Sequence, residues 1–207
     1  MKIKVCGMRN KENIQALLEL NPDYIGFIFY DKSPRFVGEA FVNEIPVLIP
    51  EKIKKVGVFV NARTSYVTGK IAKYNLDVVQ LHGGESSEYC KNLKEKNILI
   101  IKAFNLHETF DFTVLKEYEN SCEFYLFDTK VPTYGGSGRK FDWKILEKYD
   151  YHKPFFLSGG IDIGDVDEIK KLKEPDMITL DINSRFEKSP GLKDVELIEK
   201  FIKKINF

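Results

Sequence analysis

Short apolar runs alternate with longer polar stretches along the whole chain. The apolar runs are rich in Ile, Val, Leu and Phe, and several are almost continuously apolar, as parallel strands covered by helices are. We predict β-strands at residues 2–6, 24–29, 55–60, 77–81, 98–103, 124–128, 154–158 and 177–182.

The polar stretches between these runs predict helices at residues 11–20, 65–74, 85–96, 142–149, 163–173 and 194–205. The last helix is the clearest, because apolar residues recur along one stripe of its surface. That stripe consists of Val195, Ile198, Phe201, Ile202 and Ile205. Two connections do not predict a regular helix: residues 39–50 contain two prolines, and residues 105–122 show weak periodicity.

Strict alternation of strand and helix places the chain in the α/β class, either as a doubly wound open sheet or as a closed (β/α)8 TIM barrel. Eight strands in 207 residues favour the barrel, since an open sheet of this length would more often have five or six strands. We therefore expect a single (β/α)8 barrel domain over residues 1–207. Its loops would be short, because a typical barrel of this kind has about 250 residues.

Composition excludes several classes of protein. The 32 basic and 31 acidic residues leave a net charge of +1, which gives no global field for nucleic acid or an anionic membrane. The apolar runs are far shorter than the roughly 20 residues that span a bilayer, and the first residues alternate instead of forming a signal peptide. The three cysteines cannot all pair, and none has the spacing of a metal site. We expect a cytoplasmic enzyme or binding protein in a reducing compartment, with no metal.

Polar residues follow the predicted strands where each strand ends, and ligands bind at this end in both candidate folds. Cys6 ends the first strand, and its thiolate could act as a nucleophile or a base; the alternative is a buried structural thiol. Lys4 shares the strand face of Cys6 and could lower the thiol pKa. For Lys4 we favour the other interpretation, a charge that extends from the barrel floor to solvent.

Asp128 ends the sixth strand beside a run of apolar residues. We expect that surrounding to raise its pKa, which suits a general acid near neutral pH; the alternative is a capping or loop aspartate. The loop that follows carries Gly135, Gly136 and Gly138, and could close as a lid or offer backbone N–H groups to a phosphate.

Other strand ends carry residues that suit an anionic ligand. Gly159 and Gly160 precede a predicted helix, and Asn183 with Ser184 follows the eighth strand, where barrels often bind phosphate. Arg35, in the loop after the second strand, could hold a carboxylate. His82, after the fourth strand, is either a site residue or a structural hydrogen-bond donor.

Taken in order, these motifs resemble phosphoribosylanthranilate isomerase, a family of tryptophan biosynthesis. The matching segments are KVCGM at 4–8, GFIF at 26–29, SPR at 33–35, VGVFVN at 56–61, VQLHG at 79–83, FDTK at 127–130, YGGSG at 134–138, FDW at 141–143 and LSGGI at 157–161. The resemblance covers residues 2 to about 187. It implies a (β/α)8 barrel that converts N-(5-phosphoribosyl)anthranilate to its 1-deoxyribulose 5-phosphate isomer by an Amadori rearrangement, without a cofactor.

The resemblance also implies roles for particular residues. Cys6 matches the general base of the family, Asp128 its general acid, and Arg35 the residue that holds the anthranilate carboxylate. The substrate phosphate would lie against Gly159, Gly160, Asn183, Ser184 and the glycine loop 135–138. Asp181 matches an aspartate near the substrate and takes a supporting role.

The chain departs from the family pattern at two places. Ser184 is followed by Arg185-Phe186-Glu187 where Gly-Val-Glu is common, and residues 39–50 replace a regular second helix. Two alternatives stay open: the sister isomerase of histidine biosynthesis, which uses two aspartates, and a barrel that binds phosphate without turnover. Because no apolar stripe is left over on the predicted helices, we expect a monomer.

Overall fold

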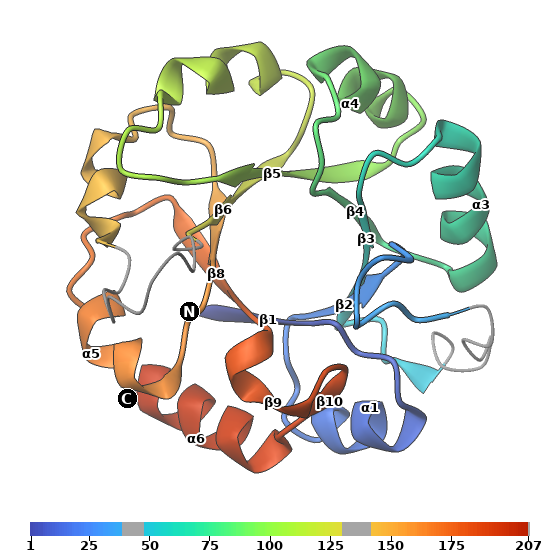
Figure 1. Ribbon diagram of the computed structural model, residues 1–207, viewed down its shortest axis with the longest axis vertical. Coiled ribbons are helices and arrows are strands. Elements are labelled where there is room, and N and C mark those ends of the chain that lie inside the picture. Colours follow the sequence, from blue (N-terminus) through green and yellow to red (C-terminus); the bar gives the residue numbers. More distant parts are fainter. Residues whose placement is uncertain (39–47, 130–141, 207) are drawn as a thin grey trace.

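The computed structural model describes residues 1–38, 48–129 and 142–206. In these residues eight parallel strands close into one barrel, each pairing with the next and β8 pairing with β1 (Figure 1). The strands are β1 Lys2–Cys6, β2 Tyr24–Ile28, β3 Lys54–Phe59, β4 Val78–Leu81, β5 Leu99–Asn105, β6 Phe124–Asp128, β7 Phe155–Ser158 and β8 Met177–Ile182. The predicted (β/α)8 barrel is confirmed, and every strand lies within two residues of its predicted bounds.

Helices surround the barrel on the outside (Figure 1). The α-helices of the described residues are α1 Lys11–Leu18, α3 Thr64–Tyr74, α4 Ser87–Lys94, α5 Val166–Ile169 and α6 Val195–Asn206. Helix α6 buries Ile198, Phe201 and Ile205 from its predicted apolar stripe. Burying one such side chain stabilises the fold by about 1.5–3 kcal/mol. None of these helices is long and apolar enough to cross a membrane.

Two predicted helices are wrong in type or length. Residues 142–149 form the 3₁₀-helix η2 Trp143–Lys148, and residues 163–173 form the 3₁₀-turn η3 Ile163–Asp165 followed by the single turn α5. A third 3₁₀-helix, η1 Phe112–Tyr118, lies where the sequence predicts no regular helix. The two buried residues of η1, Phe112 and Leu115, lie one 3₁₀ turn apart.

A short hairpin after β8 was not predicted from the sequence. It follows the turn η4 Ser184–Phe186 and consists of the antiparallel strands β9 Glu187–Ser189 and β10 Leu192–Lys193. Gly191 occupies the turn with φ +82°, a conformation that suits glycine. The Asn13 side chain of α1 fixes the hairpin, because it bonds both the N–H and the carbonyl of Lys193 at 2.7 and 2.9 Å.

Along the strands, the side chains that point into the barrel change from apolar to polar. A cluster of buried apolar side chains fills the interior: Tyr24, Val56, Val78, Ile101, Ala103, Leu126 and Phe156. Polar residues lie two positions further along several of the same strands, among them Gln80 and Asp128. The apolar cluster thus closes the amino-terminal end and leaves a polar cavity at the carboxyl-terminal end.

Candidate active site

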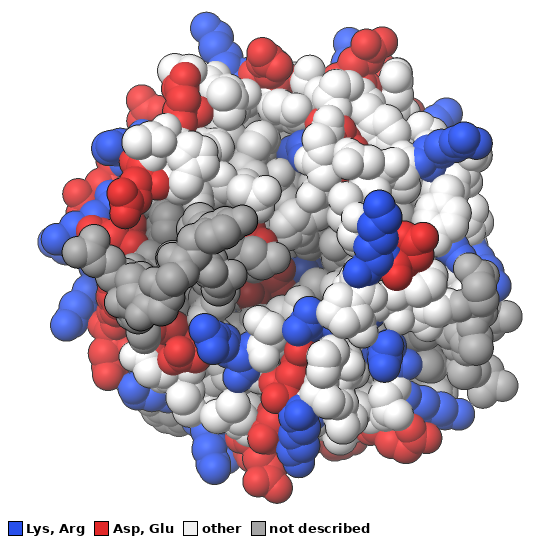
Figure 2. Space-filling view, in the orientation of Figure 1, with Lys and Arg blue, Asp and Glu red and all other residues white. Residues whose placement is uncertain are grey.

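A cavity of about 450 Å³ lies at the carboxyl ends of the strands. Figure 2 shows that face hollowed near its centre, with acidic residues visible inside the hollow. The cavity is lined by every predicted site residue within the described part of the chain. These are Cys6, Arg35, His82, Asp128, Gly159, Gly160, Asp181, Asn183 and Ser184. The predicted Gly135, Gly136 and Gly138 lie outside the described residues.

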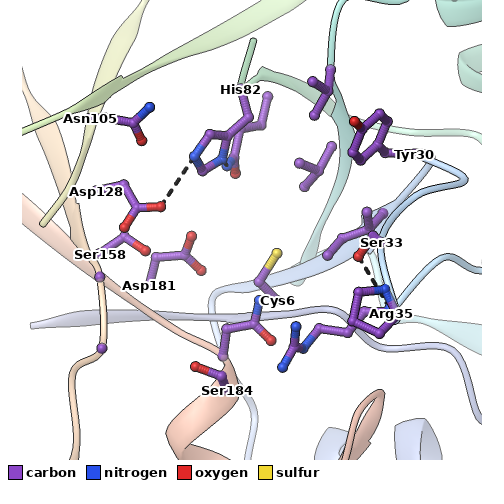
Figure 3. A pocket seen from close by; sticks show the side chains of 18 of the residues that line it. Cys6, Tyr30, Ser33, Arg35, His82, Asn105, Asp128, Ser158, Asp181 and Ser184 are labelled. Carbon is purple, nitrogen blue, oxygen red and sulfur yellow. Dashed lines mark hydrogen bonds and ion pairs between the residues drawn. The ribbon is translucent and has the colours of Figure 1, made fainter. Parts of the chain in front are cut away.

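Cys6 ends β1 and is buried, and Figure 3 shows its sulfur directed into the cavity. Gly26 of β2 makes room for the thiol, since a Cβ at that position would lie 2.8 Å from the sulfur. Burial raises the pKa of Cys6, while the ammonium groups of Lys4 and Lys193 oppose that rise. Lys4 thus acts to lower the thiol pKa as expected, but desolvation outweighs its charge and the net shift of the Cys6 pKa is upward.

Lys4 does not extend to solvent, so our favoured interpretation of this residue is wrong. Its side chain is 0% exposed inside the barrel, and Nζ lies 2.7 Å from Oδ2 of Asp181 on β8. Burial alone would lower the pKa of the Lys4 ammonium, but the Asp181 carboxylate and the Cys6 sulfur together raise it. A fixed positive charge thus lies next to both groups below the cavity floor.

Asp128 ends β6 and is buried. Its carboxylate faces the imidazole of His82 in the cavity (Figure 3). The Nε2 atom of His82 lies 3.2 Å from Oδ2 of Asp128. On the other side of the ring, Nδ1 lies 2.9 Å from the amide nitrogen of Gln80. When that amide donates to Nδ1, the neutral imidazole carries its hydrogen on Nε2, facing Asp128.

Arg35 lines the cavity from the loop after β2, and its backbone N–H donates to Ser33 Oγ at 3.1 Å. Its guanidinium does not stand alone. Nε lies 2.9 and 3.0 Å from the two carboxylate oxygens of Glu187 in β9, and Nη2 lies 2.7 Å from Oε2. This pairing across 152 positions of the chain was not predicted.

The loop after β7 needs glycine at one position in particular. Gly159 has φ +102°, and a Cβ there would lie 2.2 Å from the backbone nitrogen of Thr129. Gly160 also has a positive φ of +69°, but a Cβ there would meet no atom within 4 Å. The close backbone approach at Gly159 places the β7 loop next to the end of β6.

The loop after β8 accommodates its departure from the family pattern. Arg185 lies in the turn η4 and is not among the residues with positive φ, so the missing glycine causes no backbone strain there. The neighbouring Asn183 accepts a hydrogen bond at 2.7 Å from Nζ of the buried Lys193. Ser184 is exposed at the cavity rim.

Several residues of the cavity were not among the predicted site residues. Tyr30 and Asn105 line it, and Gln80 supports His82 from two positions earlier on the same strand face. The alternation rule for strands could have identified Gln80. An apolar wall also lines the cavity, formed by Ile28, Val58, Val60 and Ile161. Among the described residues, no three His, Cys, Asp or Glu side chains are grouped to hold a metal ion.

Comparison with known proteins points to one family. The sequence profile of N-(5'-phosphoribosyl)anthranilate isomerase matches residues 3–204. The chain is 44% identical over 207 residues to the enzyme of that name from Parabacteroides distasonis, covering 99% of this chain and 93% of the relative. It is 38% identical over 205 residues to the enzyme of that name from Thermotoga neapolitana, covering 99% and 98%.

Solved structures agree. Phosphoribosyl anthranilate isomerase from Thermotoga maritima superposes with a TM-score of 0.88 at 35% identity, covering 100% of this chain and 98% of that one. A phosphoribosyl anthranilate isomerase in complex with reduced 1-(o-carboxyphenylamino)-1-deoxyribulose 5-phosphate gives 0.86 at 31% identity and the same coverage. A third structure, of monomers generated from the dimeric Thermotoga maritima enzyme, gives 0.85 at 31%, again with that coverage. The chain belongs to the N-(5'-phosphoribosyl)anthranilate isomerase family of enzymes.

Proposed function

We propose that this enzyme converts N-(5-phosphoribosyl)anthranilate to 1-(2-carboxyphenylamino)-1-deoxyribulose 5-phosphate in tryptophan biosynthesis. The observation that carries the proposal is the meeting of Cys6, Asp128 and Arg35, from three distant parts of the chain, in one cavity. Such a cavity offers a proton donor, a proton acceptor and a cation to a single small molecule. The complex of a related isomerase with a reduced product supports the same substrate class.

Asp128 acts first in this proposal, as the general acid. Its protonated carboxyl gives a proton to the ring oxygen of the ribose, the C1–O bond breaks, and the electron pair of the anthranilate nitrogen forms an iminium. His82 holds the carboxyl in position, with Nε2 at 3.2 Å from Oδ2. A positioned acid of this kind contributes roughly 10²–10⁴-fold to the rate.

Cys6 acts second, as the general base. Its thiolate removes the C2 proton of the iminium, and the electron pair moves into the C1–C2 bond and neutralises the nitrogen. The resulting enolamine loses its O2 proton and gains a proton at C1, which gives the ketone. Substrate and product are isomers, and the iminium accepts the electrons, so the reaction needs no cofactor.

Binding is assigned to the remaining residues. Arg35 pairs with the anthranilate carboxylate, and the apolar wall accommodates the aromatic ring. The phosphate is bound by Gly159, Gly160, Asn183 and Ser184, together with the loop that carries Gly135, Gly136 and Gly138. Asp181 supports the site through its ion pair with Lys4.

A fluorescence progress curve with freshly generated phosphoribosylanthranilate and no added metal tests this function. Anthranilate fluorescence should fall faster than spontaneous substrate breakdown, and free anthranilate should not accumulate. Turnover of only the phosphoribosylated substrate of the histidine pathway would identify the sister isomerase instead. Absence of turnover together with tight binding of the reduced product analogue would identify a binding-only barrel.

A further inference from the structure

Four polar side chains from distant segments form one ionic cluster beside the cavity, here called the Glu187 cluster: Arg35, Asn183, Glu187 and Lys193. Glu187 lies at its centre with a side chain only 4% exposed. Besides Arg35, its carboxylate accepts from Nζ of Lys193 at 2.6 Å and from the N–H of Gly191 at 3.0 Å. One carboxylate therefore joins the loop after β2 to the hairpin after β8.

The guanidinium of Arg35 is held in one orientation by Glu187. The carboxylate binds Nε and Nη2, so the pairing leaves Nη1 for another acceptor. Bidentate pairing of a planar guanidinium fixes its plane as well as its position. The stem of Arg35 lies close against Gly7, where an added Cβ would be 2.9 Å from Cδ of Arg35.

Lys193 connects Glu187 to the loop after β8. Its side chain is 0% exposed, and Nζ binds Oδ1 of Asn183 at 2.7 Å and the Asn183 carbonyl at 3.2 Å. Asn183 in turn lies close to Gly7, because a Cβ added to Gly7 would be 2.9 Å from Oδ1 of Asn183. The Glu187 cluster thus includes one cavity residue from the loop after β2, Arg35, and one from the loop after β8, Asn183. In the proposed function these two residues bind opposite ends of the substrate.

We propose that Glu187 is a positioning residue, which orients Arg35 toward the substrate carboxylate and, through Lys193, sets Asn183 toward the phosphate. Glu187 itself does not touch the substrate. The inference rests on the proposed function and extends it, since it names the group that determines recognition of the carboxylate. Buried charges of this kind need mutual partners, so removing the central anion disturbs every member of the Glu187 cluster.

Charge within the Glu187 cluster supports this role. Burial opposes ionisation of Glu187, but hydrogen bonds from Arg35, Lys193 and Gly191 outweigh it and hold its pKa below the ordinary value. The carboxylate is therefore charged at neutral pH. Burial lowers the pKa of Lys193, and its hydrogen bond to Glu187 opposes that change. The Glu187 cluster contains two basic groups and one carboxylate, a composition that suits an anionic ligand nearby.

The variant Glu187→Gln tests the inference, because its amide can still accept from Lys193 and Gly191 but presents N–H groups to Arg35. KM for phosphoribosylanthranilate should rise roughly tenfold or more, as for loss of a charged hydrogen bond, while kcat changes much less. Preference for this substrate over phosphoribosylaniline, which lacks the carboxylate, should fall by a similar factor. A merely structural role of Glu187 would not change that preference.

The matched control is Glu199→Gln, which breaks the exposed pair between Glu199 and Lys203 on α6 and should leave both constants unchanged. In an Arg35→Met background, Glu187→Gln should add no further loss of carboxylate preference. If Glu187→Gln does not fold, Glu187→Asp keeps the charge, withdraws it by one methylene and should show the same change in KM.

The outcomes separate this inference from the proposed function. If the native enzyme turns over phosphoribosylanthranilate and a folded Glu187 variant keeps the native KM and the native preference for the carboxylate, the inference alone is overturned. If Glu187→Gln reduced the carboxylate preference equally in the native and in the Arg35→Met background, that result would overturn the inference as well. A native enzyme that neither turns over the substrate nor binds the reduced product would overturn the proposed function, and the inference with it.

Discussion

The interactions of Lys4 depend on its position in the closed barrel. The alternation of a strand places Lys4 two residues before Cys6 on the same inner face. Sequence alone could not predict that it pairs with Asp181, because the two residues are 177 positions apart and meet only when β8 closes on β1. The buried ammonium therefore serves two groups of the site.

Lys4→Met should shift the pH profile of the reaction. Burial already raises the pKa of Cys6, and removing the Lys4 ammonium raises it further. In the proposed mechanism Cys6 acts as a thiolate base, so the limb of the kcat/KM profile that rises with formation of the thiolate should move to a higher pH in the variant. Rate profiles and ultraviolet titration of the thiolate measure this shift.

Lys55→Met is the matched control for Lys4→Met. Lys55 is also buried in a strand and paired with an aspartate, Asp77, at 3.0 Å, but it is not among the charged groups that act on the Cys6 thiol. Both variants should lower the free energy of unfolding, by about 3 kcal/mol for the fully buried Lys4 pair. An unshifted profile in Lys4→Met, or the same shift in Lys55→Met, would contradict the role of Lys4.

At the scale of elements, the sequence predicted the strands well and the connections less well. Near-continuous apolar runs indicate parallel strands because both faces of such a strand are buried, as in β6. The connections η1 and η2 were harder to predict, since they bury only two and three residues and so give no strong periodic signal. The hairpin β9–β10 is too short to produce any pattern, yet it supplies Glu187 and Lys193.

The loop after β7 yields a prediction at this scale. Gly159→Ala should weaken phosphate binding and lower stability, because its Cβ would collide with the backbone of Thr129 at a φ of +102°. Gly160→Ala keeps the positive φ but has open space, so it should cost only about 1–2 kcal/mol. KM for the substrate and the urea midpoint of unfolding measure the two effects.

Gly69→Ala provides the opposite control. Gly69 lies exposed inside α3 with no atom within 4 Å of an added Cβ, so the substitution should stabilise the protein by about 0.5–1 kcal/mol. Activity should not change. If Gly159→Ala were as harmless as Gly69→Ala, the close backbone approach of the β7 loop would not matter for the site.

At the scale of the whole molecule, closure of the barrel brings the carboxyl ends of all eight strands to one cavity. The fold class and the residues that line the cavity could be predicted because carboxyl-terminal strand ends meet on one face of any such barrel. The partners of those residues could not, since Arg35 and Glu187 are separated by most of the chain. The sequence indicates which residues surround the cavity, and closure determines which of them pair.

We predict that the enzyme is a monomer, in contrast to the dimeric Thermotoga maritima relative. Among the described residues, the exposed large apolar side chains lie singly on different segments: Met1, Leu48, Tyr66, Leu99, Val114 and Leu192. Scattered residues of this kind do not mark an interface. Sedimentation equilibrium should give a mass near 24.0 kDa, and twice that value would show that a dimer forms.

The most direct test of the central claim is kcat/KM of Cys6→Ala and Asp128→Ala with phosphoribosylanthranilate. Both variants should fold as the native protein does and lose activity by roughly 10²-fold or more, because each lacks one proton-transfer group. Cys90→Ala, which removes a buried thiol outside the cavity, should stay active. Activity near the native level in folded Cys6→Ala and Asp128→Ala would contradict the assignment of base and acid.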